Sequence, residues 1–369
     1  EFDTRGQPDP HLNLFYADGH GKVKNQSEWN QAHRKLVGNF LANGYLYWYY
    51  DMNQYFNTPA YRLEIKQVQN VIKKLFKRPK TKFSVDVCAV LGDRQSEFTN
   101  HWMLLTNHIN YNPQQQEYAV SGVPMHKVTL SEIRKYPELQ NYKVYIFFQN
   151  AYFSDAERQF INRELKKDGR VIIWVYDPGF ISDRGMNDAE FSQLIGMQVE
   201  SSEKPGKPFA IYDKSAPFMN NVPDMCNGLN YLSVVFPDWP GWKNFRITEE
   251  NITVMAKYAE DGSVAGAMKK FADWTSIYLA NPHSLHGSLL RNIAEGNDCY
   301  VAGDYGQELS IDGDFASVHG IIKNDNYTLN LPAGKKKIYD AFTGLLLAEN
   351  IEKYTFQVEP WQTYWFFME

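Results

Sequence analysis

The stretch Asn43–Met52, NGYLYWYYDM, places five aromatic side chains in six residues and then a carboxylate at Asp51. Aromatic rings stack on the C–H faces of sugars, and a carboxylate accepts hydrogen bonds from sugar hydroxyl groups. Trp48 and Asp51 are therefore candidate substrate-binding residues for a carbohydrate. A structural interpretation fits the same pattern equally well, with Trp48 packed in a core and Asp51 at the start of a helix. The sequence leaves both interpretations open.

Cysteine and histidine residues are a second possible source of chemistry. Cys88, Cys226 and Cys299 are widely spaced and form no CxxC motif, so they indicate neither a disulfide framework nor a zinc site. Cys88 lies among alternating apolar residues, which is typical of a buried structural thiol rather than of a nucleophile. His283 and His286 have helical spacing but no third ligand nearby. We therefore expect no metal site and no cofactor.

Helical and strand patterns flank the aromatic stretch. Residues 27–42 carry apolar side chains at helical spacing, and Asn43-Gly44 supplies a C-terminal stop. A strand is expected at Tyr45–Tyr50, and Thr58-Pro59 then begins a second helix with proline at its first position. This order of helix, strand, acid and helix is typical of the last part of a (β/α)8 barrel, whose strands carry active-site residues at their C-terminal ends.

A complete barrel of this kind needs about 250 residues. Only 44 residues precede the expected strand at Tyr45. We therefore expect that an N-terminal barrel segment completes the fold as a partner of this chain. Without such a segment, the two helices would expose their apolar faces, which argues against a free-standing module.

The middle of the chain alternates strands and helices. FSVDVCAVL (83–91), KVYIFFQNAYF (143–153) and RVIIWVYDPG (170–179) predict buried strands. Ser154 and Glu157 form a capping box for the helix between the last two strands. A strand, a helix and a strand within about thirty residues indicate a βαβ unit and hence a parallel sheet covered on both faces.

The C-terminal part changes to short strands separated by turns, which is typical of a small antiparallel β-sandwich. The fold class is therefore α/β plus all-β. We predict three domains: the tail of a TIM barrel at 1–80, a parallel-sheet α/β domain at 81–296, and the sandwich at 297–369. The strands expected in the sandwich lie near 318–322, 327–331, 337–342, 354–358 and 363–367.

The composition excludes several classes of protein. The chain has 369 residues and a net charge of −5 with both signs scattered, so we expect no nucleic-acid partner. We interpret the basic cluster Lys73–Lys82 as a solvated helix end and linker rather than a phosphate site. No apolar run reaches the roughly eighteen residues of a membrane span, so we expect no membrane association. The location of the protein is undetermined, with a periplasmic or secreted one favoured over a cytoplasmic one.

Several stretches, taken together, resemble the β-galactosidases of glycoside hydrolase family 42 and their bacterial relatives. EFDTRG (1–6) resembles the end of barrel strand seven, and NFLANGYLYWYYDM (39–52) resembles the following helix and strand eight. Residues 121–148, 154–181 and 271–295 resemble the trimerisation domain of these enzymes, which implies a flavodoxin-like or class I amidotransferase-like fold for 81–296. Residues 338–358 resemble the terminal sandwich. The resemblance is collinear and covers nearly the whole chain.

The resemblance implies a retaining glycosidase that hydrolyses O-glycosidic bonds in oligo- or polysaccharides. Such enzymes use a nucleophile and an acid/base carboxylic acid about 5 Å apart. Glu1 matches the position of the nucleophile, although EFDTRG differs from the family motif there and Glu-Phe is also what a cloning site leaves. The acid/base glutamate belongs to strand four, which this chain lacks. We therefore expect negligible hydrolysis by this chain alone.

The resemblance also implies that the middle domain is a subunit interface, so we expect a homo-oligomer, either a trimer or a dimer. A glutamine amidotransferase needs a cysteine on the elbow after its strand, where this sequence has Tyr176–Phe180 and no cysteine. We therefore expect no amidotransferase activity. Two hypotheses remain: a C-terminal, structural and oligomerising portion of a β-galactosidase-like glycoside hydrolase, or an autonomous noncatalytic module for assembly or carbohydrate binding.

Overall fold

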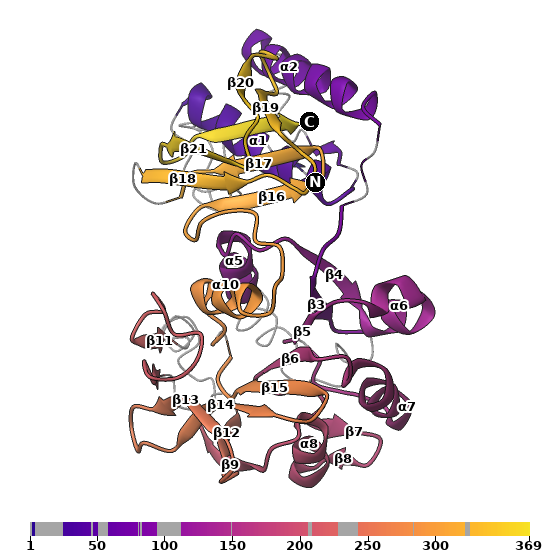
Figure 1. Cartoon of the computed structure of the whole chain (residues 1–369), viewed down its shortest axis with the longest axis vertical. Coiled ribbons are helices and arrows are strands. Elements are labelled where there is room, and N and C mark those ends of the chain that lie inside the picture. The colour runs from indigo at the N-terminus through magenta and orange to yellow at the C-terminus, as the bar shows by residue number, and fades with distance from the viewer. Residues whose placement is uncertain are drawn as a thin grey trace. The chain divides into compact units, whose positions relative to one another are not determined.

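The computed structural model of the chain, drawn in Figure 1, forms two compact units. The first unit comprises Glu1–Ser84, Ala119–Gly122 and Ala302–Glu369, and the second comprises Val85–Tyr118 and Val123–Val301. The domain boundaries predicted at residues 80 and 296 stay predictions. The structure describes residues 2–3, 25–45, 47–50, 58–79, 81, 83–93, 112–148, 150–205, 209–227, 243–282, 284–321 and 325–369.

The first unit combines two helices with an antiparallel sandwich. The α/β plus all-β class predicted from the sequence is confirmed. Two strands, β16 (Glu308–Asp312) and β20 (Leu346–Glu349), were not indicated by the sequence pattern. The helices are α1 (Gln26–Ala42) and α2 (Pro59–Phe76). One sheet has the order β16 (Glu308–Asp312), β17 (Phe315–His319), β22 (Thr363–Met368), β19 (Lys337–Asp340), β20 (Leu346–Glu349), and the other pairs β18 (Asp325–Asn330) with β21 (Lys353–Val358).

Strand β22 shows why the aromatic run TYWFFM forms the middle of this unit. Side chains alternate between the two faces of a strand. Trp365 and Phe367 pack in the cluster that contains residues of α1 and α2, whereas Phe366 and Met368 pack in the core shared with β18 and β21. Both faces of the strand are thus buried, which accounts for the lack of polar alternation.

Helices α1 and α2 cover one face of the five-stranded sheet. Val37 of α1 and Val68 and Val71 of α2 are buried in one cluster with Trp365. Gly38 allows α1 to approach closely, because a Cβ atom there would lie 2.7 Å from the indole nitrogen of Trp365. The expectation that these helices would expose their apolar faces is therefore wrong, since the C-terminal sheet buries them.

Local signals set the ends of the N-terminal elements. The side chain of Asn25 caps α1 by accepting a hydrogen bond of 3.0 Å from the N–H of Glu28. Gly44, with a φ of 68°, follows the helix as the Asn-Gly stop predicts. The strand expected at Tyr45–Tyr50 is shorter, since β2 comprises only Tyr49–Tyr50. Tyr49 and Tyr50 pair with Phe2 and Asp3 of strand β1, and a strand extends only as far as its backbone groups are paired.

The second unit is built on a mixed sheet, and its parallel half confirms the predicted βαβ unit. Strand β5 (Val144–Phe147) is followed by helix α7 (Asp155–Phe160) and then by strand β6 (Arg170–Val175), which pairs in parallel with β5. Both hydrogen bonds of the capping box at Ser154 are present. The parallel order is β15 (Trp274–Leu279), β6 (Arg170–Val175), β5 (Val144–Phe147), β3 (Val87–Leu91), β4 (Met125–Thr129).

Antiparallel strands extend this sheet beyond β15, and helices complete its core. The side chains of α5, α6, α8 and α10 are buried in the same cluster as those of the strands. No helix in the described ranges is both long and apolar enough to cross a membrane. The remaining elements are α5 (Asn112–Val120), α6 (Leu130–Lys135), the 3-10 turn Pro137–Gln140, the π-turn Ile161–Leu165, β7 (Ile181–Ser182), β8 (Gly185–Met186), α8 (Asp188–Ile195), β9 (Val199–Pro205), β10 (Phe209–Tyr212), β11 (Met225–Asn227), β12 (Lys243–Ile247), β13 (Thr253–Tyr258), β14 (Val264–Lys270) and α10 (Gly287–Glu295).

Candidate functional site

The candidate sugar-binding stretch contains one strand of a parallel pair in the first unit. Strand β1 (Phe2–Asp3) pairs in parallel with β2 (Tyr49–Tyr50), and α1 lies between them in the sequence. Glu1 directly precedes β1 in the sequence, and Asp51 directly follows β2. Both lie outside the described residues, so their roles as nucleophile and substrate-binding carboxylate stay predictions.

Trp48 is the one predicted site residue that the structure describes. Its side chain is 55% exposed, whereas Tyr47 beside it packs against the cluster between the helices and the sheet. The ring of Tyr47 stacks on that of Phe40 with 6.2 Å between ring centroids. The alternation expected of a strand is therefore kept at these two positions, with one ring directed inward and the other outward. Binding of a sugar by Trp48 stays a prediction.

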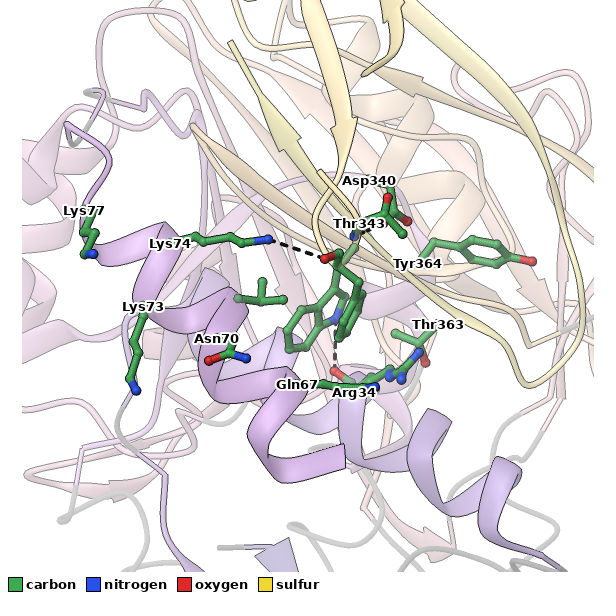
Figure 2. A pocket seen from close by; sticks show the side chains of 13 residues that line it. Arg34, Gln67, Asn70, Lys73, Lys74, Lys77, Asp340, Thr343, Thr363 and Tyr364 are labelled. Carbon is green, nitrogen blue, oxygen red and sulfur yellow. Dashed lines mark hydrogen bonds between the residues drawn. The ribbon is translucent and has the colours of Figure 1, made fainter. Parts of the chain in front are cut away.

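A groove of about 790 Å³ lies between α2 and the five-stranded sheet of the first unit. Figure 2 shows the polar side chains of α2 on one side and residues of β19, β22 and the turn after β19 on the other. The sequence analysis missed it, because the walls come from opposite ends of the chain. Its lining comprises Arg34, Gln67, Asn70, Val71, Lys73, Lys74, Lys77, Asp340, Phe342, Thr343, Thr363, Tyr364 and Trp365.

In the second unit, β6 ends in a sharp elbow at Tyr176, which has a φ of 72°. A non-glycine residue in this left-handed region is strained, and such residues are often found at functional sites. The backbone of Tyr176 donates to the carbonyl of Leu279 at 2.8 Å and accepts from the hydroxyl of Tyr278 at 2.9 Å. Its own hydroxyl accepts a 2.9 Å hydrogen bond from the N–H of Lys243. The elbow is thus present, but a buried and anchored tyrosine occupies it.

A row of three polar residues follows the C-terminal ends of three neighbouring parallel strands. Asn150 comes after β5, Asp177 after β6 and Asn281 after β15. All three side chains are buried, and each has a side-chain oxygen with no hydrogen-bond partner among the residues that the structure describes. The amide of Asn150 donates to the carbonyl of Leu91 at 3.0 Å. Ligand sites of parallel α/β sheets lie at this edge.

Asp177 is the charged member of the row. Its side chain is only 9% exposed, and burial raises its pKa to about 7 because the carboxylate loses hydration; a hydrogen bond to its own backbone offsets only part of this rise in pKa. Tyr176 and Tyr278 contribute buried hydroxyl groups near this carboxyl, and burial raises the pKa of both hydroxyls as well. Asp177, which follows the end of β6, is thus a carboxyl group whose protonation changes near neutral pH.

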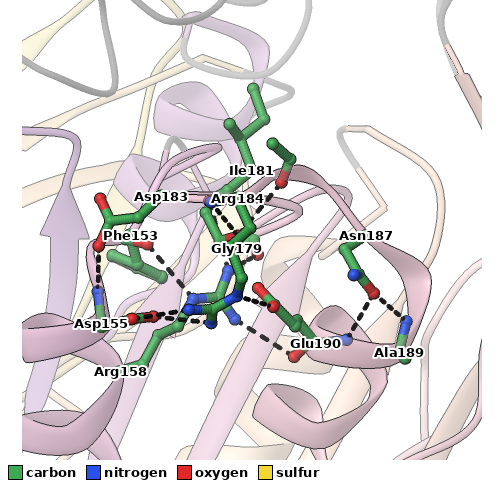
Figure 3. Close-up of polar contacts among 12 residues, drawn as sticks. Phe153, Asp155, Arg158, Gly179, Ile181, Asp183, Arg184, Asn187, Ala189 and Glu190 are labelled. Atoms are coloured by element: carbon green, nitrogen blue, oxygen red, sulfur yellow. Dashed lines mark hydrogen bonds and ion pairs between the residues drawn. The ribbon is translucent and has the colours of Figure 1, made fainter.

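Arg158 of α7 holds the segment that follows the elbow. It donates to the backbone carbonyls of Phe153 at 3.3 Å, Glu190 at 3.2 Å and Ile181 at 3.3 Å, and also to that of Gly179. Figure 3 shows this guanidinium among the carbonyls of three separate segments. Hydrogen bonds from a buried charged donor are stronger than neutral ones. Arg158 therefore fixes the path of the chain after β6.

The cysteine and histidine candidates have structural surroundings. Cys88 is fully buried in β3, and burial raises the pKa of its thiol, so the reactive thiolate is disfavoured. Cys299 is also buried and forms no disulfide with any side chain that the structure describes. Nδ1 of His286 lies 2.7 Å from the hydroxyl of Ser288 at the start of α10, and His283 lies outside the described residues. Within the described ranges, no group of three or more His, Cys, Asp or Glu side chains could hold a metal ion.

No protein-family model matches the sequence, and no curated protein sequence matches it significantly. Solved structures do match. The β-galactosidase of the Antarctic haloarchaeon Halorubrum lacusprofundi aligns with a TM-score of 0.58 and 12% identity over 92% of this chain and 50% of its own. Gan42B, a GH42 β-galactosidase, aligns with a TM-score of 0.57 and 12% identity over 86% and 45%. An α-L-fucosidase isoenzyme from Paenibacillus thiaminolyticus aligns at 0.56 and 12% over 92% and 57%.

This chain thus spans about half the length of the β-galactosidases that it matches. Such an overlap is consistent with the C-terminal part that the motifs predict. At this level of identity, the likeness establishes the fold and leaves the activity to be proposed. The resemblance inferred from the sequence is confirmed: over most of its length, the chain has the fold of the family 42 β-galactosidases.

Proposed function

We propose that this chain is the C-terminal part of a β-galactosidase-like, retaining glycoside hydrolase that acts on oligo- or polysaccharides. The observation that supports it most directly is the parallel pairing of β1 with β2, with α1 between them and α2 after them. This is the order of elements in a (β/α)8 barrel. The likeness to β-galactosidases of about twice the aligned length supports the same proposal.

In this proposal, the catalytic work is divided between two segments. An N-terminal barrel segment supplies the acid/base carboxylic acid that protonates the leaving oxygen. This chain supplies Glu1 as the nucleophile, together with Trp48, which stacks on a sugar ring, and Asp51, which accepts hydroxyl hydrogen bonds. The second unit is a noncatalytic, amidotransferase-like scaffold through which copies assemble into a trimer or dimer. The occupation of its elbow by Tyr176 in place of a cysteine supports a structural role.

An autonomous noncatalytic module is the second candidate function, and one observation favours it. The apolar faces of α1 and α2 are buried against the C-terminal sheet, so the first unit has a core of its own. A module for assembly or carbohydrate binding therefore does not need a barrel to cover these helices. The two candidates differ in whether a barrel segment restores activity.

The isolated 369-residue chain should not hydrolyse nitrophenyl β-D-galactoside above background, because in this proposal the acid/base carboxylic acid belongs to the barrel segment. The product of the complete gene, if it encodes the barrel segment, should release galactose with retention of the anomeric configuration, measured by proton NMR. Turnover by the isolated chain that survives repurification and follows the protein peak would contradict the division of labour. A complete gene product without a barrel segment would favour the noncatalytic module.

In the barrel-completed protein, Asp51→Ala should lower kcat/KM by about 10- to 100-fold, the loss expected when a charged hydrogen-bond partner is removed. Trp48→Ala should raise KM with little change in Tm, because its ring is 55% exposed. Tyr45→Ala, another exposed ring of the same stretch, is the matched control for Trp48. If Asp51→Ala lowers Tm and leaves the kinetics unchanged, the carboxylate only begins a helix, and the structural interpretation is correct.

A further inference from the structure

The groove beside α2 carries more positive than negative charge. Four cationic residues line it, whereas Asp340 is the single carboxylate in its lining. An oxygen of Asp340 accepts hydrogen bonds from the N–H and hydroxyl of Thr343, at 2.7 and 2.8 Å, so that this carboxylate holds the turn. The charge of Arg34 is matched by Glu64, which accepts two hydrogen bonds of 2.8 and 2.7 Å from it. The excess positive charge is therefore that of the lysines.

Three lysines supply this excess along the last turns of α2. Lys74 donates to the carbonyl of Phe342 at 3.4 Å. Lys73 and Lys77 are exposed and form no ion pair with any residue that the structure describes. They are four residues apart, which places them on one face of the helix, where like charges repel each other. An anion bound between them would remove this repulsion.

Neutral hydrogen-bonding groups continue the same face of α2. Gln67 and Asn70 precede Lys73 and Lys77 at spacings of three and four residues, so the four side chains form one polar row. The row extends over about 15 Å of helix. Amides donate to and accept from hydroxyl groups, whereas ammonium groups bind carboxylates. The row therefore suits an elongated ligand that carries hydroxyl groups at one end and negative charge at the other.

The aromatic floor of the groove disfavours nucleic acid as this ligand. The ring of Phe342 is covered by the guanidinium of Arg34, 4.3 Å from its centroid, and stacks on Trp365 at 5.1 Å. Trp365 itself is fully buried. Neither ring offers the free stacking surface that single-stranded nucleic acids need.

We propose that the groove between α2 and the β19–β22 part of the sheet binds acidic oligosaccharides, chains that contain uronate sugars. Lys73 and Lys77 bind the carboxylates, and Gln67 and Asn70 bind the hydroxyl groups. The volume of about 790 Å³ is within the range of small-ligand sites, which is roughly 300–1,000 Å³. The choice of a sugar among acidic ligands rests on the proposed function. The site itself needs no barrel segment, since its described lining belongs to the first unit.

The test is calorimetric binding of polygalacturonate oligomers to the isolated chain at low salt, with neutral β-1,4-galactan oligomers as the comparison ligand. The chain should bind the acidic oligomers at least tenfold more tightly than the neutral ones. Lys73→Glu/Lys77→Glu should abolish this preference, and Lys73→Gln/Lys77→Gln should reduce it severalfold. Lys270→Glu/Lys353→Glu, which has the same change of charge on exposed lysines outside α2 and the groove, should change the affinity less than twofold.

Equal loss of affinity in the groove variant and in the control variant would overturn the proposal, because binding would then depend on net charge alone. Absence of any preference for the acidic oligomers would also overturn it. Tighter binding of single-stranded DNA or anionic phospholipid vesicles, lost in the same groove variant, would assign the groove to those ligands instead. Binding by the isolated chain is measured without hydrolysis, so a failure here leaves the glycosidase proposal standing, and the reverse also holds.

Discussion

The free energy of unfolding is expected to fall by about 4 kcal/mol between pH 4 and pH 8 because Asp177 is buried. The substitution Asp177→Asn is expected to abolish this fall. Burial raises the pKa of Asp177 to about 7, whereas an unfolded aspartate titrates near its model value of 3.8. The folded state therefore holds the proton more tightly. Stability is unaffected by this group below pH 4, falls as the pH rises from about 4 to about 7, and is constant above.

The measurement is hydrogen exchange of the β6 amides, which reports the opening of the second unit alone, at several pH values after correction for intrinsic exchange. Asp273→Asn, an exposed carboxylate of the same unit, is the control and should keep the pH dependence of the wild type. The asparagine variant should show a much flatter dependence. If wild type and Asp177→Asn have the same pH dependence, Asp177 is ionised and paired at neutral pH, and the assignment is wrong.

Much of the fold could be predicted from local patterns. The capping box at Ser154, the apolar run of β6 and the helical spacing of α1 each lie in one short segment, and each is present in the structure. The antiparallel strands β13 and β14 were not predicted. Gly266 and two alanines weaken the strand pattern of β14, which is stabilised by its pairing with neighbours on both sides.

The candidate site of the second unit could not be predicted in the same way. Asn150, Asp177 and Asn281 are far apart in the sequence, and only the pairing of β5, β6 and β15 brings the ends of their strands to one edge of the sheet. Each alone is an ordinary polar residue after a strand. The elbow position at Tyr176 was predicted from its place after an apolar run, but the sequence gives no sign that the carboxyl beside it is buried.

The groove beside α2 could not be predicted from the sequence either. The interpretation of Lys73–Lys82 as a solvated helix end considered one wall only, because the opposite wall, β22, comes at the end of the chain. The spacing of Gln67, Asn70, Lys73 and Lys77 is the one signal that could have indicated a shared polar face. What lies across from that face depends on tertiary packing, which periodicity does not report.

Arg158→Met should lower the unfolding free energy of the second unit by about 3 kcal/mol or more. Arg158 is 8% exposed and donates to four backbone carbonyls, each of which would lose this charged donor in the variant. Methionine fills a similar volume, so the loss would report hydrogen bonding rather than a cavity. Arg158→Lys should give an intermediate loss, because an ammonium group keeps the charge but cannot reach all four carbonyls.

Arg184 is the matched control, since its ion pairs join the same segments at the surface. It is 56% exposed and binds both oxygens of Asp155 at 2.8 and 2.9 Å. Solvent screens such a pair, so Arg184→Met should destabilise the unit much less than Arg158→Met. Hydrogen exchange of residues 176–187 measures both variants, and Arg158→Met alone should remove protection there. Equal effects of the two substitutions would mean that the segment after the elbow is held by its surface ion pairs, and that the buried guanidinium does not determine its path.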